Sequence, residues 1–249
     1  MIIDRLLAAI KPGRIVSIQV GMTRTAVVAE TDEGIKCGLA ATFMDSYTNY
    51  HERPAVSRAG QLLDVPAREL AEMINSDSLT ESTIGLAVIN ALLPGGLEHA
   101  FALNGHDYLV QHGLDQNIAL IGHFPFIDLL LPVAKNVWTF ELNPRPGDLP
   151  AEKAPEYFPK ADIIAITATT IINKTFDELI PLCRPDATVI MLGPSTPLSP
   201  ILFDLGVQVI SGTRVLDINA AILGIAQASS MHQLRERGIV EFITAESNS

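Results

Sequence analysis

Five short, almost entirely apolar segments recur through the second half of the chain, and this recurrence constrains the fold more than any other feature. They are residues 118–121, 137–142, 163–167, 188–192 and 207–210. Strands that are apolar throughout belong in a sheet that is covered on both faces. The intervals between them are long enough for helical crossovers, so the pattern predicts a parallel, doubly wound α/β sheet over residues 117–249.

The first part of the chain has a different pattern. Three segments rich in β-branched residues, RIVSIQVG, TAVVAET and IKCGLAAT, predict a small antiparallel sheet. After a polar, irregular stretch around His51, VPARELAEMIN predicts one helix, and Ser78 with Glu81 forms a capping box that begins a second. Residues 1–95 are therefore predicted to form an α+β unit, joined to the larger sheet by a junction at 96–116.

Composition narrows the class of partner. The chain has 249 residues, of which 48% are hydrophobic, and a formal net charge of −11. This charge opposes the phosphate neutralisation on which nucleic-acid binding relies, so no nucleic-acid partner is expected. The N-terminal segment lacks the residue order of a signal peptide and no apolar run reaches spanning length, which predicts a cytoplasmic protein without membrane insertion. The sequence leaves open whether the chain forms a homo-oligomer.

The cysteines and most histidines give no metal-binding pattern. Cys37 and Cys183 lie far apart and form no C-x-x-C motif, so they are interpreted as small buried apolar residues. The spacings of His99, His106 and His112 fit no single helix face, and these residues are interpreted as solvated loop histidines. No structural zinc is expected.

Polar residues follow each predicted parallel strand. Because the carboxyl ends of parallel strands meet at one edge of a sheet, these residues are expected to surround a ligand site, although each could also serve as a cap or turn residue. The candidate site residues at or near these strand ends are His123, Phe124, Glu141, Thr169, Thr170, Asn173, Gly193, Ser195 and Thr196.

The first of these strand ends resembles a nucleotide site in spacing but not in composition. Glu141 lies nineteen positions after Gly122, about where a dinucleotide or adenosyl site places its ribose-binding acid. Phe124 and Ile127, however, stand near the positions of the second and third glycines, so the phosphate cradle is missing. His123 precedes a helix predicted to begin near Pro125, whose dipole favours a neutral imidazole that either ligates a metal or caps the helix.

Two candidates come from the N-terminal unit. Gly21 lies in the connection between the first two strands and serves either a tight turn or a loop that closes over a cleft. Asn90 is a polar residue within the apolar second helix, where it satisfies a neighbouring backbone group or holds a loop that faces the second unit.

Four segments carry a family resemblance: SDSLTESTIGLAVINALL, ALIGHFPFI, ADIIAITATTIINKTFDELI and MLGPSTPLSPILFDLGVQVISG. Together they resemble the family described as putative heavy-metal chelation, which combines an enolase N-terminal-like domain with a Rossmann-like domain. The resemblance implies a pocket between the domains and an association with metal, siderophore or cobalamin handling. It matches His123, Phe124 and Pro125 to the family's glycine-histidine-phenylalanine-proline turn and Glu141 to its acid after the second strand. It also matches Thr169, Thr170, Asn173 and Thr175 to the family's third-strand block, and residues 193–197 to its fourth-strand loop. The activity of that family is not established.

Three functions follow as hypotheses. The first is a protein that binds, or also processes, a small anionic or metal-chelating ligand in an interdomain cleft, with His123 and Glu141 as candidate metal ligands. The second is a Rossmann-type enzyme with an adenine-containing cofactor such as adenosylmethionine or a nucleotide. The third is a non-catalytic ligand sensor. The sequence assigns no catalytic residue and no definite cofactor beyond a metal ion or metal chelate.

Overall fold

The N-terminal unit is a three-stranded antiparallel sheet with helices against it. The computed structural model describes residues 1–44 and 55–247, so the irregular stretch predicted around His51 lies outside the described residues. After α1 (Ile2–Ala9), strands β1 (Gly13–Val20), β2 (Arg24–Thr31) and β3 (Gly34–Ala41) form a meander, as predicted. The predicted first helix is α2 (Ala67–Glu72), extended by a 3-10 turn (Met73–Asn75) and preceded by another (Leu62–Asp64).

The long apolar helix α3 (Leu79–Leu92) packs directly on this sheet. Its N-cap is Ser78, whose side chain accepts a hydrogen bond from the Glu81 amide, as the sequence predicts. A Cβ on Gly38 of β3 would lie 2.1 Å from the Ala87 carbonyl oxygen of α3. Only glycine at this position allows the helix and the strand to approach so closely.

The second unit is a seven-stranded sheet. Its spatial order is β10-β9-β8-β7-β4-β5-β6, and only β10 runs antiparallel to its neighbour. Numbered along the chain, the six parallel strands lie in the order 3-2-1-4-5-6, which is that of the Rossmann fold. The strands are β4 (Asn117–Ile121), β5 (Asn136–Glu141), β6 (Leu149–Pro150), β7 (Ile163–Thr167), β8 (Thr188–Leu192), β9 (Val209–Val215) and β10 (Val240–Glu246).

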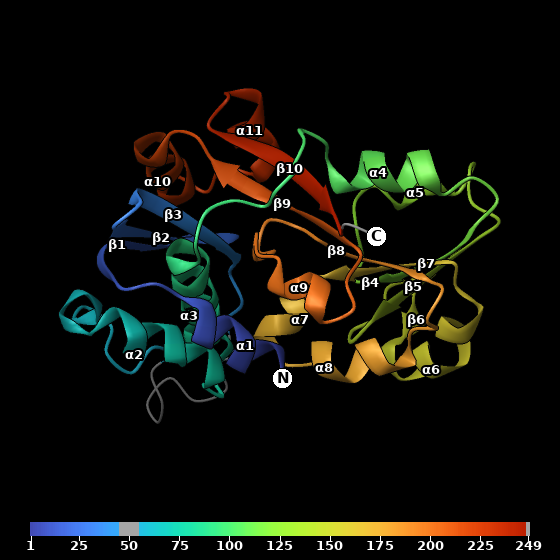
Figure 1. The fold of residues 1–249 in the computed structure, drawn as a ribbon, viewed down its shortest axis with the longest axis horizontal. Coiled ribbons are helices and arrows are strands. Elements are labelled where there is room, and N and C mark those ends of the chain that lie inside the picture. Colours follow the sequence, from blue (N-terminus) through green and yellow to red (C-terminus); the bar gives the residue numbers. More distant parts are fainter. Residues whose placement is uncertain (45–54, 248–249) are drawn as a thin grey trace.

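Helices cover both faces of this sheet (Figure 1). On one face α4 (Gly105–His112) and α5 (Ile127–Leu130) bury Leu109 and Leu130 against β4, β7 and β8. On the other face the short helices are α6 (Ala154–Tyr157), α7 (Thr169–Ile172), α8 (Phe176–Leu179) and α9 (Ile201–Asp204), joined by 3-10 turns at Ala151–Lys153, Phe158–Lys160 and Ile180–Leu182. One hydrophobic cluster runs from this face into α1 and α3, so the two units share a core.

The C-terminal helices return to the first unit. α10 (Ile218–Ala226) lies against β1 and β2, and α11 (Met231–Glu236) leads into β10 (Figure 1). Ala221 and Ile225 share a buried cluster with Ala26 and Leu39 of the small sheet. The small sheet therefore packs against α3 and against α10.

Five features differ from the prediction made from sequence. β6 and the antiparallel β10 were not predicted, and the last predicted strand begins at Val209 rather than at residue 207. The helix expected near Pro125 begins at Ile127 and has only four residues. Helix α4 lies within the segment assigned to the junction. Within residues 1–44 and 55–247, no helix has both the length and the apolar character needed to cross a bilayer.

Candidate functional site

A cleft of about 440 Å³ lies where the carboxyl ends of the parallel strands face the small sheet. We call it the strand-end cleft. It occupies the position where strand order reverses, between β4 and β7, which is where ligands bind in open α/β sheets. Its walls come from the loops after β4, β7 and β8, from β9 and β10, from the start of α4, and from Arg24 and Ala41 of the small sheet.

Two glycines shape the loops at the floor of the cleft. Gly122 after β4 has φ +111° and Gly193 after β8 has φ +115°, a region that favours glycine. A Cβ on Gly122 would also lie 3.1 Å from the Thr167 side chain. The glycines therefore allow the chain to turn sharply at two strand ends and bring the following residues to the same space.

The loop after Gly122 is fixed by two carboxylates. The His123 amide donates to Glu141 Oε1 at 2.6 Å, and His123 Nδ1 lies 2.9 Å from Asp148 Oδ1. The short strand β6 pairs Pro150 with Glu141 and so places Asp148 beside the end of β5. With Nδ1 held by Asp148, Nε2 is the ring nitrogen left for a ligand.

The Asp148 carboxylate is ionised more readily than usual. Its side chain is only 3% exposed, and this burial opposes ionisation. The hydrogen bonds from His123 and from the Arg145 amide outweigh burial, so the pKa of the Asp148 carboxyl lies below its usual value. An ionised Asp148 favours the tautomer of His123 that carries its proton on Nδ1.

Arg24 enters the cleft from the first residue of β2. Its Nη1 donates to the Thr23 carbonyl oxygen at 2.6 Å, but its Nε is buried with no hydrogen-bond partner among the described residues. No ion pair involving Arg24 occurs within the described part of the chain. Burial lowers the pKa of its guanidinium below the usual value. A half-buried cation without an acidic partner is the arrangement that an anionic ligand would complete.

Aromatic rings form one wall of the cleft. The rings of Phe124 and Phe126 are stacked with centroids 5.1 Å apart, and His106 lies 5.6 Å from Phe126. His106 was interpreted from sequence as a solvated loop residue; instead it lies in the first turn of α4 and lines the cleft. That prediction was wrong because no local pattern indicates that α4 begins beside the carboxyl ends of the parallel strands.

The hydroxyl groups near the cleft are largely engaged within the protein. Ser195 Oγ accepts a hydrogen bond from the Ala41 amide at 2.7 Å, which links the loop after β8 to β3. Thr169 Oγ1 lies 3.1 Å from Thr167 Oγ1, and Thr170 donates to the Thr167 carbonyl oxygen. Ser195 and Thr169 line the cleft, but their hydroxyls also hold its loops in place.

The structure brings together six of the residues selected from the sequence and separates five. His123, Phe124, Glu141, Thr169, Gly193 and Ser195 line the cleft. Thr170, Asn173, Gly21, Asn90 and Thr196 do not. Asn173 Oδ1 accepts from the Thr175 amide and hydroxyl, and a Cβ on Gly21 would lie 2.6 Å from the Ile225 side chain, so these two have local roles. Asn90 and Thr196 line a second pocket instead.

The protein groups do not form a cage for a bare metal ion. Among residues 1–44 and 55–247, no three side chains of His, Cys, Asp or Glu converge in a way that could hold one. Burial raises the pKa of the Cys37 thiol to about 12 and that of the Cys183 thiol to about 11, which disfavours their thiolate forms. The donor set fits a metal that arrives with most of its ligands and takes one imidazole nitrogen from His123.

Comparisons with known proteins agree with this architecture. Residues 104–244 match one family model and residues 3–93 match another, and both models carry the description "Putative heavy-metal chelation". An uncharacterized protein of Methanocaldococcus jannaschii is 26% identical over 226 residues, covering 87% of this chain and 85% of the relative.

Two solved structures have the same fold. A protein of unknown function from Desulfitobacterium hafniense superposes with a TM-score of 0.81 at 24% identity, covering 99% of this chain and 98% of that one. A protein of unknown function from Pyrococcus horikoshii gives a TM-score of 0.79 at 22% identity with the same coverage. Both belong to the family whose model matches residues 104–244.

Proposed function

Because the chain belongs to the family described as "Putative heavy-metal chelation", we propose that it binds a small anionic metal chelate in the strand-end cleft. The ligand supplies most of the metal coordination and the negative charge. The protein supplies one imidazole, one guanidinium and an aromatic wall. The observation that carries this proposal is the half-buried Arg24 side chain, whose Nε is buried and lacks a partner within the described residues.

Charge supports an anionic rather than a cationic ligand. The chain carries a formal net charge of −11, and yet Arg24, a partly buried cation, has no acidic partner among the described residues. Among the described residues, Glu141 is the only one with a carboxylate in the cleft lining, and its Oε1 accepts a hydrogen bond from the His123 amide. A carboxylate or phosphate group beside Arg24 would give the half-buried guanidinium both a counter-ion and a hydrogen-bond acceptor.

The pairing of His123 with Asp148 supports a metal in that ligand. Metal-ligating histidines commonly donate the second ring N–H to a carboxylate, which fixes the ring and raises its basicity. His123 is 29% exposed, whereas Asp148 behind it is almost fully buried. This geometry supports His123 as a single protein ligand for a metal with an open coordination position.

The adenine-cofactor hypothesis is the second candidate, and one observation favours it. The parallel strands have the Rossmann order, and Glu141 ends the strand next to β4, where a ribose-binding acid belongs. Against it, Phe124 is stacked on Phe126 in the loop where a phosphate would approach the backbone. We therefore rank this function second.

Isothermal titration calorimetry on untagged protein tests the proposal. The probes are nickel(II) nitrilotriacetate, which is an anionic chelate with open coordination positions, nitrilotriacetate alone, Ni²⁺ alone, and S-adenosylmethionine. We expect the chelate to bind more tightly than either component, and His123→Ala and Arg24→Gln each to weaken binding at least tenfold. The exposed His232→Ala and Arg14→Gln are the matched controls and should bind as the wild type does.

Two results would overturn the proposal. Equal binding of bare Ni²⁺ and the chelate would mean that the ligand's charge plays no part. Tight binding of S-adenosylmethionine with no chelate binding would favour the second candidate. Turnover assays with whichever probe binds would then separate an enzyme from a non-catalytic sensor.

A further inference from the structure

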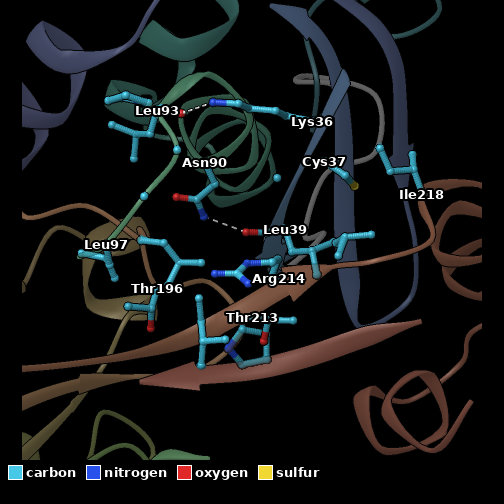
Figure 2. Close-up of a pocket in the computed structure, with 18 of the residues that line it drawn as sticks. Lys36, Cys37, Leu39, Asn90, Leu93, Leu97, Thr196, Thr213, Arg214 and Ile218 are labelled. Carbon is cyan, nitrogen blue, oxygen red and sulfur yellow. Dashed lines mark hydrogen bonds between the residues drawn. The ribbon is translucent and has the colours of Figure 1, made fainter. Parts of the chain in front are cut away.

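A second cavity, of about 230 Å³, lies between the two units (Figure 2). We call it the interunit pocket. It is lined by β3, the end of α3 and the loop that follows it, the loop after β8, and β9. Within the part of the chain that the structure describes, its lining shares only Pro194 with the strand-end cleft. It is therefore a separate site that the proposed chelate does not use.

Three buried side-chain oxygens in this lining have no hydrogen-bond partner among the described residues: Asn90 Oδ1, Thr196 Oγ1 and Thr213 Oγ1. They come from α3, the loop after β8, and β9, and Thr196 is only 3% exposed. Buried polar groups of native proteins are normally hydrogen-bonded, to protein, water or ligand. Three unpartnered atoms from three elements around one cavity therefore indicate that its occupant completes them.

The orientation of Asn90 defines what one partner must be. Its Nδ2 donates to the Leu39 carbonyl oxygen at 2.8 Å and to the Ser195 carbonyl oxygen at 3.0 Å. Both amide hydrogens are used, so Oδ1 is left as an acceptor that faces the pocket lining (Figure 2). The occupant must donate a hydrogen bond here, whereas the two threonine hydroxyls can either donate or accept.

The charges around the pocket favour a neutral occupant. Lys36 is paired with Glu33 at 2.6 Å and also donates to the Leu93 carbonyl oxygen, and Arg214 is paired with Glu241 at 2.9 Å. No carboxylate side chain of residues 1–44 and 55–247 belongs to the lining, which disfavours an ammonium group. Most of the other side chains in the lining are apolar, with those of Leu39, Leu198 and Ile243 among them.

Water alone is a poor occupant of this volume. Liquid water takes roughly 30 Å³ per molecule, and a buried water needs two to four polar partners. The pocket has room for several waters, but it offers few free polar side-chain atoms, and most of its lining side chains are apolar. A compact molecule with a carbon skeleton and several hydroxyl groups would form hydrogen bonds with the three oxygens and pack its carbon atoms against the apolar side chains.

We propose that the interunit pocket binds a small, neutral, polyhydroxylated molecule through Asn90, Thr196 and Thr213. A hydroxyl group is the smallest group that can donate to Asn90 and also accept from a threonine. The volume lies below the usual range for drug-sized ligands, so a molecule of a few carbon atoms fits.

Ligand-observed NMR titrations test this proposal, with propane-1,2-diol, glycerol and erythritol as probes and lactate and sulfate as anionic controls. We expect at least one of the polyols to bind saturably and the anions not to bind at this site. Thr196→Val and Thr213→Val remove one oxygen while keeping the side-chain shape, and each should weaken polyol binding about tenfold. Arg24→Gln should leave polyol binding unchanged, which keeps this test independent of the strand-end cleft.

Thermal melting of the same variants distinguishes a ligand role from a structural one. Because the Thr196 hydroxyl has no partner in the described protein, Thr196→Val should melt at the wild-type temperature or slightly above it. Thr170→Val is the control, since its buried hydroxyl donates to the Thr167 carbonyl oxygen and its loss should lower the melting temperature. Three results would overturn the proposal. If no polyol binds, the pocket holds only ordered water. Polyol binding that both valine variants retain would mean that the threonine hydroxyls play no part, and anion binding that Arg214→Gln abolishes would mean that the pocket is an anion site.

Discussion

Replacing Arg24 by methionine should stabilise the ligand-free protein. Methionine is similarly long and unbranched, and it removes the buried Nε that lacks a partner in the described structure. An unsatisfied buried donor costs about 1–3 kcal/mol, and the hydrogen bond lost to the Thr23 carbonyl oxygen contributes about 1 kcal/mol. The net gain is therefore roughly 1 kcal/mol, which raises the melting temperature by about 2–4 °C in a chain of this size.

Differential scanning calorimetry without ligand measures this change, and Arg184→Met provides the control. Arg184 is also partly buried, and its Nε likewise has no hydrogen bond among the described residues, but unlike Arg24 it forms ion pairs with Asp162 at 2.8 Å and with Asp186 at 3.0 Å. Its replacement should lower the melting temperature because it leaves Asp162 without this partner. If Arg24→Met lowered the melting temperature as much as the control does, Arg24 would be a structural residue. The reasoning that makes it an anion-binding group would then be refuted.

Three further substitutions test other parts of the account. Asp148→Asn should lower the free energy of unfolding by about 1–2 kcal/mol near neutral pH. Because the folded-state pKa of Asp148 is depressed, its stabilising contribution is present above pH about 4 and is lost as the pH falls through that pKa. In urea titrations, the unfolding free energies of the variant and the wild type should therefore converge in acid. Ser195→Ala should lower the unfolding free energy by about 1–2 kcal/mol, since the Ala41 amide loses its acceptor, and a wild-type urea midpoint would contradict this. Gly38→Ala should prevent folding, as judged by circular dichroism, because the added Cβ would lie 2.1 Å from the backbone of α3. Gly95→Ala is the control and should fold, because its added Cβ would lie 3.0 Å from the end of a side chain only.

The main parts of the fold could be predicted from the sequence because they depend on local patterns. Apolar runs of strand length gave the parallel sheet, and Ser78 with Glu81 gave the start of α3. β6 could not be predicted, because two residues, Leu149 and Pro150, carry no periodicity. β10 could not be predicted because it runs antiparallel to its neighbour at the edge of the seven-stranded sheet, and an antiparallel edge strand needs no helical crossover that a sequence pattern would indicate.

The site was only partly predictable, for a related reason. The strand-end rule identified His123 and Glu141, since it needs only the position of each strand. It could not identify Asp148, whose approach to His123 depends on the pairing of β6. It also could not identify Arg24, which belongs to the other unit and enters the cleft only because that unit docks against the strand ends. Because of the same docking, Asn90 and Thr196 line the interunit pocket and not the strand-end cleft.

The position of a bound metal tests the central claim most directly. Crystals grown with nickel(II) nitrilotriacetate, measured at the nickel absorption edge, would locate the metal by its anomalous signal. The account predicts one principal peak in the strand-end cleft, about 2.1 Å from His123 Nε2, with a carboxylate of the chelate in hydrogen-bond contact with Arg24. A principal peak at a surface histidine such as His232, with the cleft empty of metal, would contradict it.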